Sequence, residues 1–498
     1  MNVNPITRLD YPDPDVIRVE DTYYMVSTTM HFMPGCEILQ SFDLVHWEHV
    51  TYVYETLDHT DAQQLKSGQN IYGQGMWAAS LRYHEGRFYI CFVANDTRKT
   101  YLYTSEKIDG PWKKQLIEGF YHDGSLLFDE DGRNYIVYGN DEIWITELNE
   151  DLTAPKKDGL HRLLVSDHKN PELGYEGSHI QKINGYYYIF LVHSLRDRWM
   201  RTEACFYSDS LEGEFTGGDV LCDDRGYCGQ GVAQGGIVDT PDGKWYAMLF
   251  QDSGAVGRIP ILVPVTWKDH FPFFGQNGHV PEEIEVHSTR PGYIYQPLVG
   301  SDDFCNGLLH RWQFNHDPDP RYYHLDALQG TYTITTREVC TELTQAVNTL
   351  TQRMSYPSCA AEVTVDASAL KEGDVAGLCA LQSCYAAVGI TKHHGKYEVL
   401  MLDKKEDGIL DMTEGTVVES HQMDFRLEAD FCNMKDEARC YYRVNKGDWL
   451  PIGTVHKLYF KLDHFTGCRF GLFCYAAEET GGSACFRDFK YYDVDEIS

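Results

Sequence analysis

Apolar and polar residues alternate along most of this chain, a pattern with the period of β-strands, and helical periodicity is almost absent. One phrase occurs five times: a turn residue, then aromatic residues, then a short hydrophobic run. Each copy closes a predicted hairpin that begins about a dozen residues earlier. The copies contain Tyr24, Tyr89, Tyr135, Tyr188 and Tyr246, which lie between 46 and 65 residues apart. Repeats of this length are typical of propeller blades.

A further strand follows several of these hairpins. Segments 38–47, 101–112 and 205–215 each contain a strand that ends near a serine, followed by a turn and an aromatic residue. Hairpins extended in this way predict four-stranded blades. The sequence therefore predicts an all-β protein in which residues 1–288 form a five-bladed β-propeller.

The pattern changes in the second part of the chain. Residues 289–302 contain proline, glycine and serine and are predicted to be a linker. Beyond them, segments 331–336, 360–365 and 470–475 alternate and are separated by turn residues. A chain of 498 residues is too long for one core, and residues 303–498 are predicted to form a two-sheet β-sandwich.

Near the start of the first strand of each hairpin, one position is equivalent in all five repeats. Counting back from the shared tyrosines gives these positions as Asp13, Trp77, Asp123, Glu176 and Gln234. Five sheets around one axis would bring the five positions together at one mouth. Three carboxylates held there without a nearby lysine or arginine would repel one another, so their pKa values should be forced apart. A protonated acid beside an ionised carboxylate is what glycoside hydrolysis requires.

The local sequence suggests a role for each acid. Asp13 lies between two prolines, and the resulting stiffness suits a general base that orients water. The longer side chain of Glu176 can reach a leaving-group oxygen, and Asp123 would raise the pKa of that acid. Asp15 has no counterpart in the other repeats and is interpreted as a turn residue.

The remaining candidates follow from position alone. Trp77 is more often a core residue than a ligand platform, and its place in the repeat only modestly favours contact with a sugar. His31 and Phe32 follow the first hairpin and could line the pocket. Other histidines, including His122, His179 and His193, are interpreted as structural or surface residues.

The charge and composition of the chain argue against some classes of binding partner. The net charge of −32 is spread along the chain and disfavours nucleic acids and anionic membranes, which need clustered Lys and Arg. No run of eighteen apolar residues is found, and the first residues lack the charged and apolar regions of a signal peptide, so none is expected. The fifteen cysteines form no Cys-x-x-Cys pair, and no Cys/His spacing fits zinc, so we expect no metal ligands among them. We expect the thiols to be reduced and the protein to be cytoplasmic.

At these residues the chain resembles glycoside hydrolase family 43, the β-xylosidases and α-L-arabinofuranosidases with a five-bladed propeller. The resemblance is carried by Tyr11-Pro-Asp-Pro-Asp-Val-Ile-Arg18, by segment 33–47 and by Gly75-Met-Trp-Ala, Asp123-Gly-Ser-Leu, Glu176-Gly-Ser-His and Gly257-Arg258. It implies that Asp13 is the general base, Asp123 the pKa modulator and Glu176 the general acid of an inverting reaction. Arg258 would bind the terminal sugar.

The distal part resembles the lectin-like, concanavalin-type jelly roll that follows the propeller in the family's xylosidases. His464-Phe-Thr-Gly467 matches a loop that reaches back over the active site there, which implies that Phe465 closes the pocket. Two motifs depart from the family: Ser80 stands where Asp is common, and Gln234 where a histidine often sits beside calcium. The missing histidine weakens the case for part of the sugar contacts and for a structural calcium in the channel, which stays an open possibility, and no other cofactor is expected.

Several alternatives stay open. The expected substrate is a small neutral oligosaccharide, and the slight preference is for an exo-acting β-xylosidase with arabinofuranosidase activity. A non-catalytic carbohydrate-binding protein and an arabinan-directed hydrolase of the same family are the alternatives. A retaining fructosidase-type propeller is disfavoured because its Asn-Asp-Pro-Asn and Arg-Asp-Pro motifs are missing. The aromatic faces of the sandwich could support a homo-oligomer.

Overall fold

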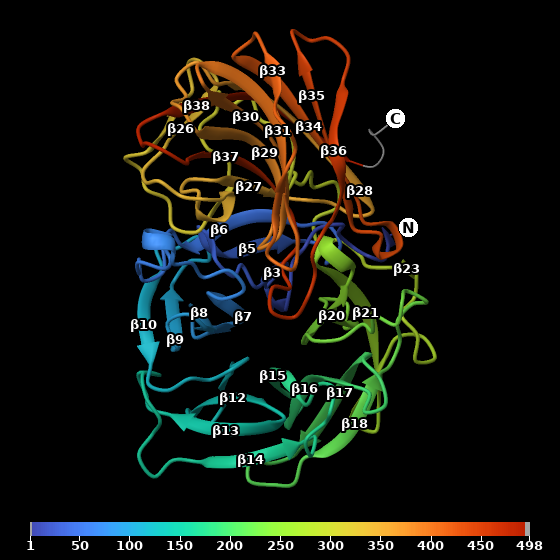
Figure 1. The fold of residues 1–498 in the computed structure, drawn as a ribbon. Coiled ribbons are helices and arrows are strands. Elements are labelled where there is room, and N and C mark those ends of the chain that lie inside the picture. Colours follow the sequence, from blue (N-terminus) through green and yellow to red (C-terminus); the bar gives the residue numbers. More distant parts are fainter. Residues whose placement is uncertain (1, 494–498) are drawn as a thin grey trace.

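The protein is built almost entirely from β-strands. The computed structural model describes residues 2–493, and this range contains no α-helix. Its four helical segments are short 3-10 turns: η1 (Lys66–Gly68), η2 (Gly254–Val256), η3 (Leu343–Gln345) and η4 (Cys432–Met434). Five four-stranded sheets surround a common axis, and a two-sheet sandwich packs on one side of the ring (Figure 1). No helix within residues 2–493 is long and apolar enough to cross a membrane.

Each propeller blade is a four-stranded antiparallel sheet. The first blade contains β2 (Asp15–Val19), β3 (Thr22–Val26), β5 (Gly35–Ser41) and β6 (Glu48–Tyr54). The second contains β7 (Met76–His84), β8 (Arg87–Ala94), β9 (Lys99–Ser105) and β10 (Lys113–Ile117). The third contains β11 (Ser125–Phe128), β12 (Asn134–Asn140), β13 (Glu142–Leu148) and β14 (His161–Ser166). The fourth contains β15 (Glu176–Ile183), β16 (Tyr186–Ser194), β17 (Arg201–Ser208) and β18 (Thr216–Leu221), and the fifth β19 (Ile237–Asp239), β20 (Trp245–Asp252), β21 (Arg258–Lys268) and β22 (Phe271–Phe274).

The repeated phrase corresponds to the second strand of every blade. The five shared tyrosines lie on β3, β8, β12, β16 and β20, and the predicted third strands are β5, β9 and β17. These middle strands are covered on both faces, so their apolar residues form nearly continuous runs, as in the eight consecutive buried residues that end β16. The predicted five-bladed propeller is confirmed.

The first and fifth blades share no strand, and side-chain contacts help to close the ring between them. The guanidinium of Arg18 on β2 binds the Asp239 carboxylate on β19, with Nη2 2.5 Å from Oδ2. A two-stranded ribbon of β1 (Asn2–Val3) and β23 (Glu283–Ile284) ties the chain start to the end of the propeller. The Asn4 amide extends this tie by donating to the Leu262 carbonyl oxygen in blade 5.

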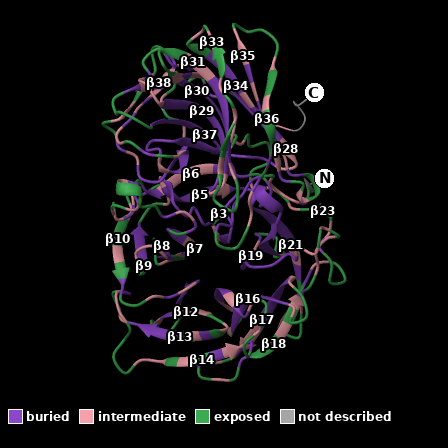
Figure 2. Ribbon diagram, in the orientation of Figure 1, coloured by how far each residue is buried: buried purple, intermediate pink, exposed green. Residues whose placement is uncertain are grey.

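The second part of the chain forms two large sheets. One sheet contains β24 (Gln313–Asn315), β27 (Leu350–Arg353), β29 (Asp374–Leu381), β30 (Tyr385–His393), β31 (Lys396–Lys404), β32 (Leu410–Met412), β33 (Thr416–Val418) and β37 (Arg469–Ala476). The other contains β25 (Tyr323–Asp326), β26 (Thr331–Thr335), β28 (Ser358–Asp366), β34 (Gln422–Asp430), β35 (Glu437–Val444), β36 (Leu450–Lys457) and β38 (Ser483–Asp493). Their facing sides enclose one apolar core, visible as buried strands in Figure 2. The predicted sandwich is confirmed.

A strand of the propeller belongs to a sheet of the sandwich. β4 (Phe32–Met33) pairs with β24, so that Phe314 faces Met33 at the edge of the sheet. No strand lies between β23 and β24 in the described chain, which is the region of the predicted linker. The two domains are therefore joined by backbone hydrogen bonds as well as by side-chain packing.

Candidate active site

The five inner strands begin with the same local geometry. A residue in the left-handed region of backbone space stands just before each strand or within its first three residues. These residues are Asp13 (φ 52°), Ala78 (φ 40°), Asp123 (φ 48°), Gly177 (φ 66°) and Gln234 (φ 67°). This conformation is uncommon for residues other than glycine and clusters at functional sites. The repeat seen in the sequence is thus also a repeat of backbone shape at one mouth of the propeller.

Both oxygens of the Asp13 carboxylate are hydrogen-bonded. Thr28 Oγ1 donates to Oδ2 over 2.5 Å, and Arg258 Nη1 donates to Oδ1 over 2.6 Å. Asp13 and Arg258 are 4% and 5% exposed, so this ion pair is held away from bulk water. The prediction that the acids have no arginine nearby is wrong, because the fifth blade brings one to Asp13 from 245 residues away in sequence.

Glu176 has a different set of partners. Asn140 Nδ2 donates to Oε2 over 2.8 Å, and His122 Nε2 lies 3.5 Å from the same oxygen. His122 Nε2 is also 3.5 Å from Asp123 Oδ2, which accepts a hydrogen bond from the Gly177 backbone amide. The imidazole of His122 therefore lies between the two carboxylates of the third and fourth blades.

These contacts set the protonation states. Burial raises the pKa of Asp123 to about 6; the charge of His122 opposes this, and those of Glu176 and Asp13 add to it. Burial acts on Glu176 in the same direction, but the hydrogen bond and charge of His122, with Arg201 and Arg258, hold its pKa below the usual value. The pKa of His122 is raised to about 9 because the surrounding carboxylates outweigh burial.

The effect of Asp123 on the acid stays a prediction, and the net pKa of Glu176 lies below its usual value because of His122, Arg201 and Arg258. A protonated His122 compensates the extra negative charge, and the carboxyl group with the raised pKa is Asp123 instead. The predicted separation of pKa values within the carboxylate cluster is found, but the raised pKa belongs to Asp123 and the lowered one to Glu176.

A row of alternating charges continues from the base. Asp252 at the end of β20 accepts from Arg258 Nε over 3.2 Å and from Arg201 Nε over 3.1 Å. All three residues are at most 5% exposed. Arg201 Nη1 is buried and has no hydrogen-bond partner. Such a donor would gain a bond from a ligand oxygen.

Gln234 is placed by a buried acid. Its backbone amide donates to Glu203 Oε2 over 2.7 Å, and burial raises the pKa of Glu203 well above its ordinary value. A Cβ on Gly177 would lie 2.6 Å from Gln234 Cγ. The Gln234 side chain thus packs on the backbone next to Glu176, as its place in the repeat predicts.

Phe465 comes to the mouth from the sandwich. Its ring centroid lies 3.7 Å from Arg258 Cζ and 5.0 Å from the ring centroid of Trp77. The Asp10 carboxylate accepts from the Arg258 and Gly467 backbone amides, both over 2.7 Å, and so holds the loop against the propeller. The structure thus brings Phe465 and Trp77 to the acids, although their contact with sugar stays a prediction.

His31 and Phe32 lie in the interface between the domains. His31 is 1% exposed, its Nε2 lies 3.0 Å from Asn315 Oδ1, and its ring packs against His316 and His464. Phe32 is covered by the Arg469 guanidinium, 3.4 Å from the ring centroid. Both residues hold the sandwich against the propeller, and their predicted contact with the substrate is untested.

Asp15 is not the turn residue expected from the sequence. It is fully buried, and Oδ2 accepts from Arg82 Nη1 over 2.8 Å while Oδ1 lies 3.0 Å from His179 Nδ1. Arg82 also donates to the Leu126 and Ile180 carbonyl oxygens. Four blades thus meet on one carboxylate–guanidinium pair, and His179 is a structural histidine as predicted.

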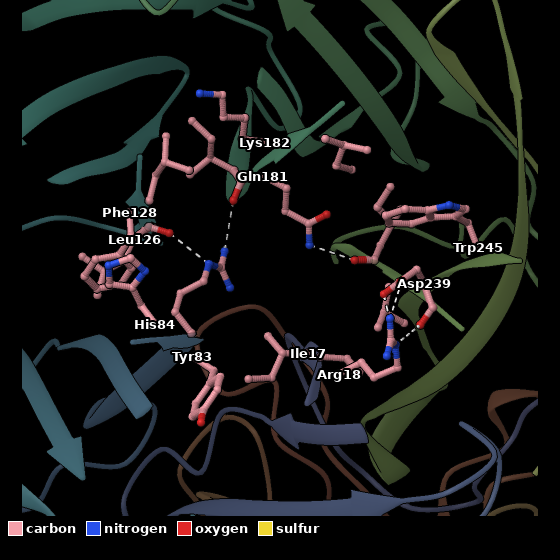
Figure 3. A pocket seen from close by; sticks show the side chains of 17 residues that line it. Ile17, Arg18, Tyr83, His84, Leu126, Phe128, Gln181, Lys182, Asp239 and Trp245 are labelled. Atoms are coloured by element: carbon pink, nitrogen blue, oxygen red, sulfur yellow. Dashed lines mark hydrogen bonds and ion pairs between the residues drawn. The ribbon is translucent and has the colours of Figure 1, made fainter. Parts of the chain in front are cut away.

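A cavity of about 410 Å³ lies at the other mouth of the ring, where the inner strands end. Figure 3 shows Arg18 bound to Asp239 in this cavity and the Gln181 amide directed at a backbone oxygen. Asp239 is the only carboxylate among its lining residues and is paired with Arg18. Without a second acid, this cavity cannot supply acid–base chemistry on a glycoside.

His122, Asp123 and Glu176 are the one cluster of the described chain with metal-ligand spacing, their ligand atoms lying within 4.8 Å of one another. The set does not fit calcium, which prefers six to eight oxygen ligands, since it offers one imidazole and two carboxylates. Glu176 Oε2 is also already bonded to Asn140. We therefore assign no step of the chemistry to a metal at this position.

Several residues of this site, among them His122, Asn140, Arg201 and Asp252, were not predicted from the sequence. His122 had a signal, because it directly precedes Asp123 in the repeat and must reach the same mouth. Asn140, Arg201 and Asp252 stand at strand ends outside the repeated phrase, and only the meeting of separate blades reveals them.

Comparison with known proteins identifies the two domains. Residues 3–272 match the family model described as glycosyl hydrolases family 43, and residues 301–492 match the β-xylosidase C-terminal concanavalin A-like domain. A β-xylosidase of Formosa agariphila is 26% identical over 99% of this chain and 89% of its own length. A non-reducing end α-L-arabinofuranosidase of Bacteroides ovatus is 24% identical over 82% of this chain and 79% of its own.

Solved structures agree with this match. A structure described as a bifunctional GH43-CE protein of Bacteroides eggerthii superposes with a TM-score of 0.91 at 42% identity. It covers all of this chain, which spans only 64% of that longer protein. An engineered GH43 glycoside hydrolase with endo-xylanase and exo-arabinofuranosidase activity gives a TM-score of 0.87 at 27% identity, covering 99% of both chains. On the family match, which covers nearly all of the propeller, including its three acids, this chain belongs to glycosyl hydrolase family 43.

Proposed function

We propose that the protein is an exo-acting, inverting glycosidase that releases terminal pentoses from xylo-oligosaccharides or arabinoxylan fragments. The observation that carries the proposal is the arrangement of acids at one mouth. Asp13 is paired with Arg258 in one position, and Glu176 is flanked by Asn140 and His122 in another. The curated relatives named above are a β-xylosidase and a non-reducing end α-L-arabinofuranosidase.

Each acid has surroundings that suit its role. Asp13 is the general base: Arg258 and Thr28 fix its carboxylate so that a free lone pair can take a proton from water. Glu176 is the general acid and protonates the glycosidic oxygen. Asp123 accepts a hydrogen bond from the Gly177 amide, and its pKa of about 6 leaves it mostly ionised at neutral pH. His122, whose pKa is raised to about 9, keeps a proton within the cluster.

Glu176 must be protonated for its role, although His122, Arg201 and Arg258 hold its pKa below the usual value. A bound sugar excludes water, and the loss of hydration destabilises the ionised form of a carboxyl group. A movement of His122 away from Glu176 would have the same effect, because its hydrogen bond and its charge are the strongest interactions that favour the ionised form. Substrate binding is thus expected to raise the pKa of Glu176.

The position of Phe465 supports exo action. Its ring lies over Arg258 and against Trp77, at the end of the loop that the sandwich sends to the propeller. A pocket closed on this side accepts the terminal residue of a chain and not its interior. The sugar contacts proposed for Trp77, Phe32, His31, Gln234, Arg258 and Phe465 belong to this terminal subsite.

Other properties of the proposed enzyme follow from its composition and packing. All fifteen cysteines are free and nine are buried, which suits a cytoplasmic enzyme that receives oligosaccharides from outside. The substrate is a small neutral oligosaccharide, and no cofactor is needed for acid–base hydrolysis. A homo-oligomer through the sandwich is compatible with this function.

The test is hydrolysis of xylobiose and of arabinose-substituted xylo-oligosaccharides by the wild type and by Asp13→Ala. Xylose released from xylobiose by the wild type alone supports an exo-xylosidase with Asp13 as base. Arabinose release alone would mean that the same chemistry removes arabinose substituents from the xylan chain. Sugar binding without any release would contradict the proposal and favour a carbohydrate-binding protein, and release from arabinan alone would favour an arabinan-directed enzyme.

A further inference from the structure

A buried carboxylate stands three residues before the proposed base, Asp13. Asp10 is 3% exposed, and its two oxygens accept hydrogen bonds from two backbone amides, Oδ1 from Arg258 and Oδ2 from Gly467, both over 2.7 Å. Arg258 begins β21 in the fifth blade, and Gly467 belongs to the sandwich loop that carries Phe465. One carboxylate thus joins its own segment to two others, 248 and 457 residues further along the chain.

The backbone of Arg258 is held at both of its polar groups. Its amide donates to Asp10, and its carbonyl oxygen accepts from the Tyr11 amide over 3.0 Å. The preceding residue, Gly257, has a φ of 101°, and a Cβ there would lie 2.1 Å from Asp10 Oδ1. Glycine therefore permits this close approach. The segment that leads to Asp13 thus fixes the backbone from which the Arg258 guanidinium reaches that acid.

The sandwich holds the turn η2, which leads into this strand. The Ala255 carbonyl oxygen accepts from the Cys468 amide over 2.8 Å, and the Ala255 amide donates to the Asp436 carboxylate over 3.0 Å. A Cβ on Gly467 would lie 2.0 Å from the Val256 carbonyl oxygen. The sandwich loop and the turn before β21 therefore lie backbone to backbone, with no room for a side chain between them.

The charge of Asp10 suits two donors. Burial raises its pKa to about 6, and the two backbone amides and the charges of Arg353 and Arg469 oppose this rise. The carboxyl group is therefore mostly ionised at neutral pH, and each oxygen can accept a hydrogen bond. Arg353 of the sandwich also donates from Nε to the Asp10 carbonyl oxygen over 2.9 Å. A side-chain amide at this position would turn a donor toward one of the two backbone N–H groups.

The two segments that Asp10 joins each carry a part of the proposed active site. Arg258 Nη1 binds Asp13 Oδ1 over 2.6 Å, and the Phe465 ring centroid lies 3.7 Å from Arg258 Cζ. Asp10 itself is buried with both oxygens on backbone amides, so it can act on a substrate only through these side chains. A shift of Asp10 would displace the guanidinium and the ring together.

We propose that Asp10 is a positioning residue that sets the Arg258 guanidinium against Asp13 and the Phe465 ring over Arg258, so that the two domains form one pocket. The inference rests on the proposed function and adds to it a residue that touches no substrate. It predicts that loss of the Asp10 carboxylate slows turnover through Arg258 and Phe465, and not merely through lower stability.

The experiment compares Asp10→Asn with Asp302→Asn on an aryl β-xyloside. Asp302 is the matched control, because it is 5% exposed and accepts from the Phe304 amide over 2.7 Å and from Trp312 Nε1 over 2.8 Å. Asp10→Asn should lower kcat/KM by about tenfold to a hundredfold, the cost of misplaced groups in an active site. Asp302→Asn should leave kcat/KM unchanged at a temperature where circular dichroism shows both variants folded.

A second variant covers the case in which Asp10→Asn does not fold. Asp10→Ser keeps one acceptor without the opposing NH2 group, and it should show a loss of the same order. Wild-type kinetics in a folded Asp10 variant, or the same loss in Asp302→Asn, would overturn the proposal.

A double-mutant cycle separates positioning from stability. When Asp10→Asn is added to Arg258→Met, kcat/KM should fall by far less than when it is added to the wild type, because the effect of Asp10 passes through that arginine. A combined loss equal to the product of the two separate losses would overturn the proposal.

Hydrogen exchange provides an arm that does not depend on turnover. In Asp10→Asn, the peptide that contains Arg258, the one that contains Gly467, or both should exchange faster, while Asp302→Asn should leave both unchanged. Unchanged exchange in both peptides of the Asp10 variant would overturn the proposal. Failure of the proposed function would look different, because the wild type would then hydrolyse neither an aryl xyloside nor an aryl arabinofuranoside. If it hydrolyses only the arabinofuranoside, the same variants are compared on that substrate.

Discussion

Arg258 Nη1 lies 2.6 Å from Asp13 Oδ1, and this contact joins the last blade of the propeller to the first residue of its first repeat. Asp252 holds the same guanidinium from the other side through Nε. The base is thus fixed by a buried ion pair whose partner is itself fixed. Charge-assisted bonds of this kind give both position and charge stabilisation.

Replacement of Arg258 tests this relationship. Arg258→Met should lower kcat/KM by about 10²–10³, the usual cost of removing one well-placed donor from an active site. Arg258→Lys should recover little, because a lysine cannot bind Asp13 and Asp252 together through a planar fork. Steady-state kinetics on an aryl xyloside measures the effect, with circular dichroism as the control for folding. Near wild-type rates in both variants would contradict the role of the pair.

Substitution of the general acid should have an effect that depends on the leaving group. Glu176→Gln keeps the hydrogen bond from Asn140 but cannot donate a proton to the glycosidic oxygen. The loss should be about 10²–10⁴ on xylobiose and much smaller on an aryl glycoside with an acidic phenol. A comparison of kcat/KM on the two substrates checks this, and equal losses would place the acid elsewhere.

His122 should control the pH dependence. Its charge and hydrogen bond hold the pKa of Glu176 down, so His122→Phe should raise that pKa and move the basic limb of the pH–rate profile upward by about one unit. The profile of kcat/KM between pH 4 and pH 10 measures the shift. A basic limb that stays in place, or moves downward, would show that His122 does not act on the acid.

The fold was predictable because each blade repeats the same short phrase. Turn glycines, aromatic pairs and apolar runs are local, and the position a dozen residues before each tyrosine follows from hairpin length. The same count located Asp13, Asp123 and Glu176. It could not locate Arg201, Asp252 or Asn140, whose contacts depend on how separate blades meet.

Asp15 shows most clearly what could not be predicted from the sequence. An aspartate next to proline is usually a turn residue, and nothing local reveals that Arg82 and His179 reach it from 67 and 164 residues away. The pairing of β4 with β24 is likewise invisible in a two-residue strand. Phe465 was expected only through the resemblance to a family, since it lies far along the chain from the acids.

The Asp15–Arg82 pair should dominate the stability of the propeller. Asp15→Asn leaves the Arg82 guanidinium, whose side chain is only 12% exposed, without its counter-charge, and the free energy of unfolding should fall by about 3–5 kcal/mol. Urea unfolding at pH 7 measures the loss. Asp21→Asn at the exposed Arg290 pair is the matched control and should cost at most about 1 kcal/mol.

The same variant has a pH signature. Burial would raise the pKa of Asp15, but Arg82 and His179 lower it from 3.8 to about 2. Its contribution to stability is therefore present above pH 3.8 and lost as the pH falls through about 2. The difference in stability between wild type and Asp15→Asn should shrink over this interval, and a constant difference would contradict the ion pair.

Phe465 should couple the sandwich to turnover. Phe465→Ala removes the ring that lies over Arg258 and against Trp77, and kcat/KM should fall by about tenfold or more through the lost contacts. Phe465→Tyr keeps the aromatic face and should retain most activity. Unchanged kinetics in the alanine variant, with the fold intact, would mean that the sandwich loop does not complete the pocket.

The most direct test of the account is the configuration of the sugar at the moment of release. Proton NMR of an aryl β-xyloside during hydrolysis should show α-xylose first, with β-xylose appearing later by mutarotation, because Asp13 directs water to the face opposite the leaving group. If arabinose is the released sugar, an aryl α-L-arabinofuranoside should give the β anomer first. Initial release with the configuration of the substrate would identify a nucleophile and contradict the roles assigned to Asp13 and Glu176.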